Sequence, residues 1–154
     1  MEISLKKADI KDCEKIHQMQ IIGFKALLDK YQDFETSPGA ETLERIKYRF
    51  EFSQIEHYFI ELHGESIGYI RVSKINDDTC RLSQMFILPN YQEKGYAQQA
   101  IKQVELLNPQ AKHWILDTIK QEEKLCHLYE KMGYKLTGAE KNIKQGMDLL
   151  YYAK

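Results

Sequence analysis

Apolar and polar residues recur along the chain with two different periods, and the changes of period mark the expected elements. Ile3 and Leu5 alternate with Glu2, Ser4 and Lys6, which predicts a short first strand. Asp9, with Asp12 three positions later, then offers the N-cap of a helix. Apolar residues follow at intervals of three and four as far as Tyr31, so one long helix is expected, with Gly23 as its weak point or a position of close contact.

A loop and a second helix come next. Residues 32–40 are rich in Asp, Thr, Ser, Pro and Gly, the residue types that favour turns. From Glu41 onward, apolar residues at helical spacing predict a second helix. Its charged residues, which are expected to face solvent, are Glu44, Arg45, Arg49 and Glu51.

Three strands follow in close succession. In residues 58–62, Tyr58, Ile60 and Leu62 alternate with Phe59 and Glu61. His63-Gly64-Glu65 is typical of a hairpin turn, and residues 66–72 are predicted to return as a second strand. A second turn at residues 76–78 leads to an apolar strand over 81–88. Because short turns join antiparallel neighbours, these three strands are expected to form an antiparallel meander.

The chain then changes from strand to helix and back. A proline at position 89 ends the strand, and apolar residues at helical spacing predict a helix from Ala97 to Leu107. Residues 112–119 form the next predicted strand, which is reached through this helical crossover. It should therefore pair in parallel with the strand over 81–88.

The C-terminal part is predicted to hold one more helix and two strands. The helix covers residues 122–132 and is closed by Gly133 as a C-cap. Strands over 134–137 and 147–152 are expected on either side of a polar hairpin loop, Gly138 to Gly146. If the Tyr151-Tyr152 strand were a sheet edge, it would be available for pairing in a homodimer.

The turn after the third strand is a candidate anion site. A strand that ends at a proline and enters a helix through a glycine-containing turn presents several unpaired backbone N–H groups at one point. Gln92 adds an amide, Lys94 adds a positive charge, and Gly95 leaves room for a ligand near the backbone. From spacing alone, an ordinary solvated turn is an equally good interpretation.

Two motifs resemble those of a known family. The run Gln92-x-x-Gly95-x-Ala97 after an apolar strand resembles the acetyl-CoA pyrophosphate loop of the GNAT N-acetyltransferase superfamily. A second segment, similar to the family's C-terminal signature, is Leu128-Tyr129-Glu130-Lys131-Met132-Gly133-Tyr134. The predicted order β-α-α-β-β-β-α-β-α-β-β is that of the GNAT fold, a mixed α/β sheet with two splayed central parallel strands. The resemblance implies a single acetyltransferase domain over residues 1–154.

The resemblance also implies where acetyl-CoA binds. The pantetheine arm would lie against the backbone of Met85, Phe86 and Ile87, between the two splayed strands. A backbone N–H at the end of this strand would stabilise the thioester oxygen as it gains charge. The pyrophosphate would bind the loop formed by Gln92, Glu93, Lys94, Gly95, Tyr96 and Ala97.

Tyr129 matches the family's tyrosine that protonates the departing sulfur. A phenol with a pKa of about 10 that donates to a thiolate with a pKa of about 8.5 loses about 2 kcal/mol. A positioned general acid can meet that cost. The same ring also falls on the core stripe of its helix, and packing there is compatible with the catalytic role.

The acceptor side is less well defined. Removing the proton of a lysine-like amine at pH 7 costs about 4.6 kcal/mol, so a base is expected. Arg81 occupies the position where some family members carry glutamate, and Glu122 stands where many have asparagine. The residues expected to bind the acceptor, a small cationic amine, are Tyr31, Asp33, Glu35, Gln84 and Asp117.

Composition excludes several partners. The chain has 154 residues, enough for one well-packed core, and its net charge of −1 gives no footprint for nucleic acid. No apolar stretch approaches the roughly 20 residues of a membrane span, and the N-terminus lacks a signal-peptide block, so a cytoplasmic protein is expected. The cysteines, at positions 13, 80 and 126, are widely spaced and predict reduced thiols without a metal site.

Three functions remain open at this point. The first is transfer of an acetyl group to a small primary amine by direct attack in a ternary complex. The second is acetylation of a protein or peptide, and the third is a non-catalytic module that binds acyl-CoA as a sensor. A plain nucleotide-binding domain is disfavoured because the chain has no Gly-x-Gly-x-x-Gly or Walker-type run.

Overall fold

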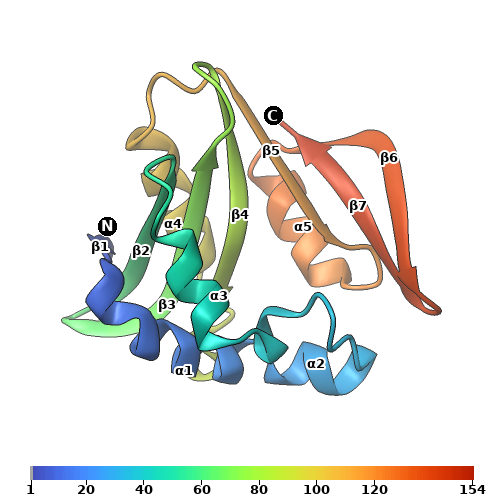
Figure 1. Ribbon diagram of the computed structural model, residues 1–154. Coiled ribbons are helices and arrows are strands. Elements are labelled where there is room, and N and C mark those ends of the chain that lie inside the picture. Colours follow the sequence, from blue (N-terminus) through green and yellow to red (C-terminus); the bar gives the residue numbers. More distant parts are fainter. Residues whose placement is uncertain (1) are drawn as a thin grey trace.

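Seven strands form one mixed sheet with helices on both faces (Figure 1). The structure is a computed structural model that describes residues 2–154. The strands are β1 (Ile3–Lys7), β2 (Ile55–Leu62), β3 (Glu65–Lys74), β4 (Thr79–Ile87), β5 (His113–Ile119), β6 (Lys135–Lys144) and β7 (Met147–Ala153), in the order β1-β2-β3-β4-β5-β7-β6. The helices are α1 (Cys13–Gly23), α2 (Lys25–Tyr31), α3 (Leu43–Arg49), α4 (Tyr96–Leu106) and α5 (Glu123–Lys131), with 3-10 turns η1 (Ile10–Asp12), η2 (Pro38–Ala40) and η3 (Pro89–Tyr91).

The predicted meander and the predicted parallel pair are both confirmed. β2, β3 and β4 pair as antiparallel neighbours, and β4 pairs in parallel with β5. The parallel ladder begins at Thr79 and His113 and ends at Arg81 and Ile115, although both strands continue beyond these residues. Ser83 is an extra residue in the β3–β4 register, and a bulge of this kind bends its strand. β4 and β5 therefore splay apart, as expected for the GNAT fold.

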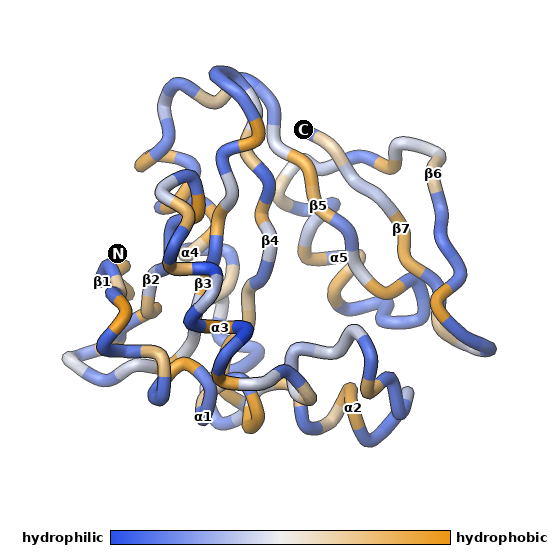
Figure 2. The backbone as a smooth tube through the Cα atoms, in the orientation of Figure 1, coloured by the Kyte–Doolittle hydropathy of each residue, from blue (hydrophilic) through white to orange (hydrophobic). Residues whose placement is uncertain are grey.

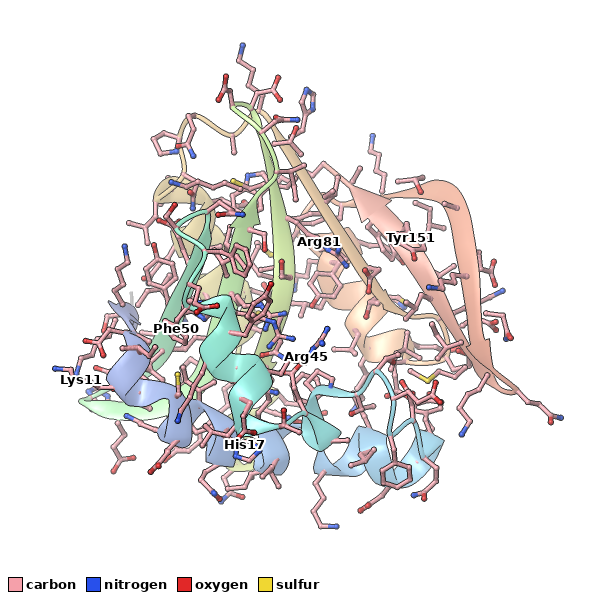
Figure 3. All side chains as sticks on the ribbon, viewed as in Figure 1. Lys11, His17, Arg45, Phe50, Arg81 and Tyr151 are labelled. Atoms are coloured by element: carbon pink, nitrogen blue, oxygen red, sulfur yellow. The ribbon has the colours of Figure 1, made fainter. Side chains whose placement is uncertain are left out.

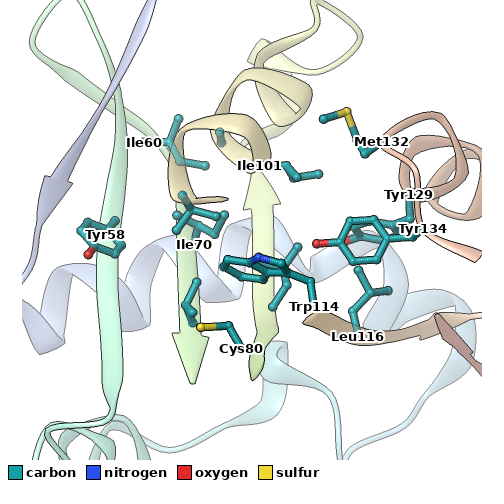
Figure 4. Packing of buried hydrophobic residues seen from close by; sticks show 14 of the residues in the cluster. Tyr58, Ile60, Ile70, Cys80, Ile101, Trp114, Leu116, Tyr129, Met132 and Tyr134 are labelled. Atoms are coloured by element: carbon teal, nitrogen blue, oxygen red, sulfur yellow. The ribbon is translucent and has the colours of Figure 1, made fainter. Parts of the chain in front are cut away.

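The two faces of the sheet carry separate hydrophobic cores. The larger core lies under α4 and α5, where Ile101, Trp114 and Tyr129 converge (Figure 4). The smaller core lies under α1 and α3 and joins Ile16 of α1 and Ile46 of α3 to the aromatic side chains of the sheet. The splayed strands thus have one helical layer on each side of the gap between them.

The long first helix is in fact two helices. α1 ends at Gly23 and α2 begins at Lys25, with Phe24 between them outside the helical geometry. A Cβ atom on Gly23 would lie only 2.5 Å from Cδ1 of Phe86 in β4, and the Phe24 ring packs edge-on against the same Phe86 ring. Tertiary packing against β4 therefore overrides the uninterrupted helical pattern of the sequence.

The predicted loop over residues 138–146 is wrong. β6 continues to Lys144, and a tight turn at Gly146, whose φ is +81°, leads directly into β7. Backbone pairing with β7 supplies the ladder that the polar composition did not indicate, and β6 appears mostly in hydrophilic colours (Figure 2). The expectation that the Tyr151-Tyr152 strand is an edge is also wrong, because β7 lies between β5 and β6.

Candidate active site

The site is centred on the gap where β4 and β5 part. From Leu82 onward, the edge of β4 that faces β5 has no strand partner in the described chain. Met85 and Ile87 pack toward the larger core, while Phe86 packs toward the smaller one. An open strand edge with free backbone groups accepts an extended ligand as an added strand, which is the role expected of these three residues for pantetheine.

The N-terminus of α4 lies just beyond this edge and is not capped by a side chain. Gly95 precedes the helix in a left-handed conformation with φ of +83°, and the carbonyl of Gly95 accepts the N–H of Gln99 at 3.2 Å. N–H groups of an uncapped first turn are suited to bind phosphate. Lys94 is exposed beside them and forms no ion pair with the residues at 2–154.

Other residues of the predicted loop brace it. The Gln92 amide donates to the Ile87 carbonyl at 2.8 Å, which ties the loop to the end of β4. Tyr96 and Ala97 pack against the larger core. The loop is therefore held close to the open edge of β4 by contacts within the protein.

A cavity of about 770 Å³ lies between α4 and α5, on the same side as this loop. Glu93, with φ of +63°, forms a 2.6 Å ion pair with Lys124 of α5 across its rim. Both side chains are exposed, and exposed ion pairs contribute little to stability, so this one opens easily. The cavity is lined by Gln98, Glu123, Lys124, His127, Leu128, Glu130 and Lys131.

Tyr129 is buried in the larger core, edge-on to Tyr134 with ring centroids 6.1 Å apart (Figure 4). Its hydroxyl forms no hydrogen bond with residues 2–154. Burial, followed by the nearby charges of Asp117 and Cys126, raises the pKa of Tyr129 well above its ordinary value. The phenol therefore keeps its proton at neutral pH.

Tyr31 is joined to α5 on the other side of the gap. Its hydroxyl donates to the Glu122 carboxylate, which also forms a 2.7 Å ion pair with Lys30. Burial opposes ionisation of Glu122, but the hydrogen bonds from Lys30 and Tyr31 lower its pKa overall. The residue that replaces the family's asparagine thus links α2 to α5.

The two predicted acidic residues of the first loop lie in different surroundings. Asp33 is buried, and its carboxylate accepts from the N–H and the hydroxyl of Thr36. Glu35 is exposed. Both line a second cavity of about 480 Å³, whose opposite wall includes Lys141 and Lys144 of β6. The Asp33 carboxylate is therefore engaged by Thr36 within the loop, and the negative charge of the cavity is partly balanced by the two lysines.

Asp117 forms an ion pair with Arg81 across the gap. Figure 3 shows Arg81 reaching from β4 toward β5, with Tyr151 on the far side. Asp117 lies opposite Tyr151 in the β5–β7 ladder. This carboxylate is thus engaged by a guanidinium rather than free to face an amine.

Sequence reasoning missed a polar cluster on the α3 side of the gap. The expected solvent exposure of Arg49 is wrong, since its side chain is only 18% exposed and binds Glu41. Arg71 of β3 lies directly opposite Gln84 of β4, which is 7% exposed. The available signal was Arg71 itself, a charged residue in an otherwise largely apolar strand, two positions after Tyr69 and therefore on the same face as Tyr69.

The gap, the uncapped helix and the cavity beside it fit the cosubstrate that the motifs imply. The open edge of β4 suits the extended pantetheine arm, and the free N–H groups of α4 suit the pyrophosphate. Within residues 2–154, no group of histidine, cysteine and acidic residues is arranged to hold a metal ion, and no helix is long and apolar enough to cross a membrane. These features are those of an acetyl-CoA-dependent N-acetyltransferase.

The chain belongs to the acetyltransferase (GNAT) family, whose profile matches residues 24–134. It is 28% identical over 143 residues to spermidine N(1)-acetyltransferase of Escherichia coli, covering 88% of this chain and 74% of that protein. Among solved structures, it resembles spermidine N-acetyltransferase of Vibrio cholerae in complex with CoA and spermine, with a TM-score of 0.79, 19% identity and coverage of 99% and 95%. It also resembles a ribosomal alpha-N-protein acetyltransferase in complex with coenzyme A, with a TM-score of 0.75, 15% identity and coverage of 100% and 94%.

Proposed function

We propose that this enzyme transfers the acetyl group of acetyl-CoA to the primary amine of a small molecule by direct attack in a ternary complex. The observation that carries the proposal is the gap between β4 and β5, which begins where their parallel ladder ends at Arg81 and Ile115. The α4–α5 face holds the cavity and the uncapped helix, so it suits the cofactor. The α1–α3 face is left for the acceptor, and the two substrates meet within the gap.

The reaction follows from these positions. The amine nitrogen attacks the thioester carbon, and the carbonyl oxygen gains charge that a backbone N–H at the end of β4 stabilises. The C–S bond then breaks, the sulfur takes a proton from the Tyr129 hydroxyl, and the phenolate regains a proton from solvent before the next turnover. The nitrogen releases its proton to water, because the nearest predicted carboxylate, Asp117, is bound by Arg81.

The raised pKa of Tyr129 makes it a weaker acid than a phenol in water. Burial disfavours every anion in the same place, so it raises the pKa of a departing thiolate as well. The difference between the two pKa values, which sets the cost of the proton transfer, is therefore smaller than the shift of Tyr129 alone suggests.

The acceptor is expected to bind near Tyr31, Asp33, Glu35, Gln84 and Asp117. The relatives named spermidine N-acetyltransferase make a polyamine one candidate. The relative named alpha-N-protein acetyltransferase keeps a protein N-terminus as a second candidate. A module that binds acyl-CoA without catalysis is the alternative from another class.

The test is release of CoA thiol from acetyl-CoA over a panel of amines that includes spermidine. The Tyr129→Phe variant is expected to lower kcat by about 10²- to 10⁴-fold with little change in the affinity for acetyl-CoA. Tyr134→Phe is the matched control, because it removes a neighbouring buried hydroxyl that bonds to Glu105.

Turnover by Tyr129→Phe at the parent rate would remove the general-acid assignment. If no amine supported turnover while acetyl-CoA still raised the melting temperature, the non-catalytic module would be favoured instead.

A further inference from the structure

A cluster of arginines on the α3 side of the sheet contains more positive than negative charge. Arg45 and Arg49 of α3 both contact Glu41, whose charge also reaches Arg71 of β3. The Glu41 carboxylate is already occupied, because it accepts from Arg49 at 2.6 Å and from Gln20 at 2.9 Å. Arg71 forms no ion pair with any carboxylate in residues 2–154. One carboxylate therefore faces three guanidinium groups.

Arg71 holds its charge in a poorly hydrated place. It lies between His57 of β2 and Gln84 of β4 in the ladder, and it is only partly exposed. Burial and the neighbouring Arg49 lower the pKa of Arg71, against the opposing effects of Tyr69 and Glu41. A hydrogen bond with the Tyr69 hydroxyl offsets part of this burial, but a buried charge without an ion-pair partner is still costly, so an anion from outside the chain would complete this site.

Gln84 gives a second, independent indication of a missing ligand. The residue is only 7% exposed, and its Oε1 atom has no hydrogen-bond partner among residues 2–154. The amide makes no hydrogen bond with any other residue in 2–154. Residues directly opposite in an antiparallel pair have Cβ atoms about 5 Å apart, so the Arg71 guanidinium and the Nε2 group of Gln84 offer neighbouring N–H donors, whereas the unpaired Oε1 of Gln84 can only accept and suits the ammonium group of the acceptor. Such planar donors suit a carboxylate.

The position of Arg71 and Gln84 indicates that the anion bound there belongs to the acceptor and not to the cofactor. Gln84 directly precedes Met85 on β4, so it lies beside the open edge where the acetyl group is expected. Arg71 and Gln84 share their sheet face with Tyr69 and Phe86, which belong to the smaller core under α1 and α3. The cavity between α4 and α5 is on the opposite face, so the phosphates of the cofactor do not reach Arg71.

We propose that the acceptor carries a carboxylate, which Arg71 binds together with Gln84, so that the enzyme acetylates an amino acid or a similar small molecule with both an amine and a carboxylate. This inference rests on the proposed function and narrows its acceptor. A polyamine would bring more positive charge to a cluster that already has an excess. An amine with a carboxylate neutralises the cluster and places its nitrogen toward the gap.

The test compares acceptors that differ only in the carboxylate. Amino acids are paired with their carboxamides, lysine with cadaverine and ornithine with putrescine, and spermidine is added. For the best pair, the parent enzyme is expected to prefer the acid by at least tenfold in kcat/KM. Arg71→Gln should lower kcat/KM for the acid by about 10- to 100-fold, chiefly through KM, and leave kcat/KM for the partner without a carboxylate nearly unchanged. Preference for spermidine or for the amides would overturn the inference.

Three variants guard against trivial effects. Lys47→Gln removes a positive charge from the exposed side of α3, the helix that carries Arg45 and Arg49, and should keep the preference for the acid. Arg71→Lys keeps the charge without the planar fork and should restore the preference in part. Gln84→Leu preserves the volume of the buried side chain and should reduce the preference even if Arg71→Gln proves too unstable to assay.

A binding measurement separates this inference from the proposed function. N-acetylated amino acids and their amides are titrated into the CoA-saturated protein by calorimetry, which requires no turnover. If the acids bind and Arg71→Gln abolishes that binding while no amine is acetylated, the carboxylate site stands and the proposed function fails. If amines are acetylated without any preference for the acids, the proposed function stands and the carboxylate site is overturned.

Discussion

Gly23 at the end of α1 lies so close to the ring of Phe86 that a methyl group at position 23 would approach Cδ1 of that ring to 2.5 Å. Phe86 belongs to the open end of β4, where the pantetheine arm is expected. Gly23→Ala should therefore destabilise the protein by about 1–3 kcal/mol, the usual range for an overpacked core, and weaken acetyl-CoA binding. Urea denaturation and calorimetric titration measure the two effects.

The second-site variant Phe86→Leu provides the control for this clash. The smaller leucine side chain leaves room for a methyl group at position 23. Gly23→Ala should therefore lower the free energy of unfolding clearly less in the Phe86→Leu background than in the parent. Equal costs in the two backgrounds would show that the glycine acts through the backbone and not through contact with the ring.

The alkaline side of the pH–rate profile should show no decline from Tyr129. An exposed phenol titrates near pH 10, but burial raises the pKa of Tyr129, so its proton is retained to higher pH. We expect kcat to rise with deprotonation of the amine and then to stay level up to about pH 10. Rates measured between pH 6 and pH 10 test this, and a fall below pH 9 that is absent in Tyr129→Phe would contradict it.

Acid should weaken the fold through His57. Burial, with the charges of Arg71 and Arg49 next in size, lowers the pKa of His57 from 6.5 to about 4. The unfolded chain therefore takes up a proton in this pH range that the folded protein does not, and stability is lost as pH falls from 6.5 toward 4. A difference of about 2.5 pKa units corresponds to about 3 kcal/mol.

Urea midpoints at pH 7, 5.5 and 4.5 measure this loss. His57→Gln should be less stable at pH 7, because it loses the 2.6 Å hydrogen bond to Tyr69 and the stacking on Phe50, but its stability should change less between the three pH values. The exposed His113→Gln should behave as the parent. An equally steep loss in His57→Gln would assign the acid sensitivity to other groups.

Lys124 should contribute to the affinity for acetyl-CoA but hardly to stability. Its ion pair with Glu93 is fully exposed, while its position at the rim of the α4–α5 cavity places its charge near the expected pyrophosphate. Lys124→Ala should raise the Kd for acetyl-CoA several-fold at low salt and less at high salt, because screening weakens exposed charges. The distant, exposed Lys11→Ala should leave the Kd unchanged at both salt concentrations.

The local structure of the segments expected to bind the cofactor was predictable because its signals are local. The loop from Gln92 to Ala97 and the segment around Tyr129 are contiguous in sequence, and Gly95 and Gly133 take the left-handed conformations that those turns require. Short-range patterns of this kind survive into the fold because neighbouring residues alone determine them.

The acceptor side was less predictable because it depends on contacts between distant segments. Arg49 looks like part of a solvated helix face until η2 brings Glu41 against it. Arg71 and Gln84 become neighbours only through the register of β3 and β4, in which Ser83 is bulged. The break in the first helix depends on a distant segment as well, because Gly23 packs against the ring of Phe86, more than sixty positions away along the chain.

The parallel ladder that joins β4 to β5 has only three residue pairs, and beyond them the two strand edges that face the gap have no strand partner in residues 2–154. The strands from β5 to the C-terminus are therefore joined to the rest of the sheet by a short stretch of backbone hydrogen bonds. A ligand that lies along β4 would contact both β4 and β5 and hold them together. Without it, the sheet should open first between these two strands, which is also where the reaction is expected to take place. Amide hydrogen exchange along β5 should then be faster without acetyl-CoA than with it.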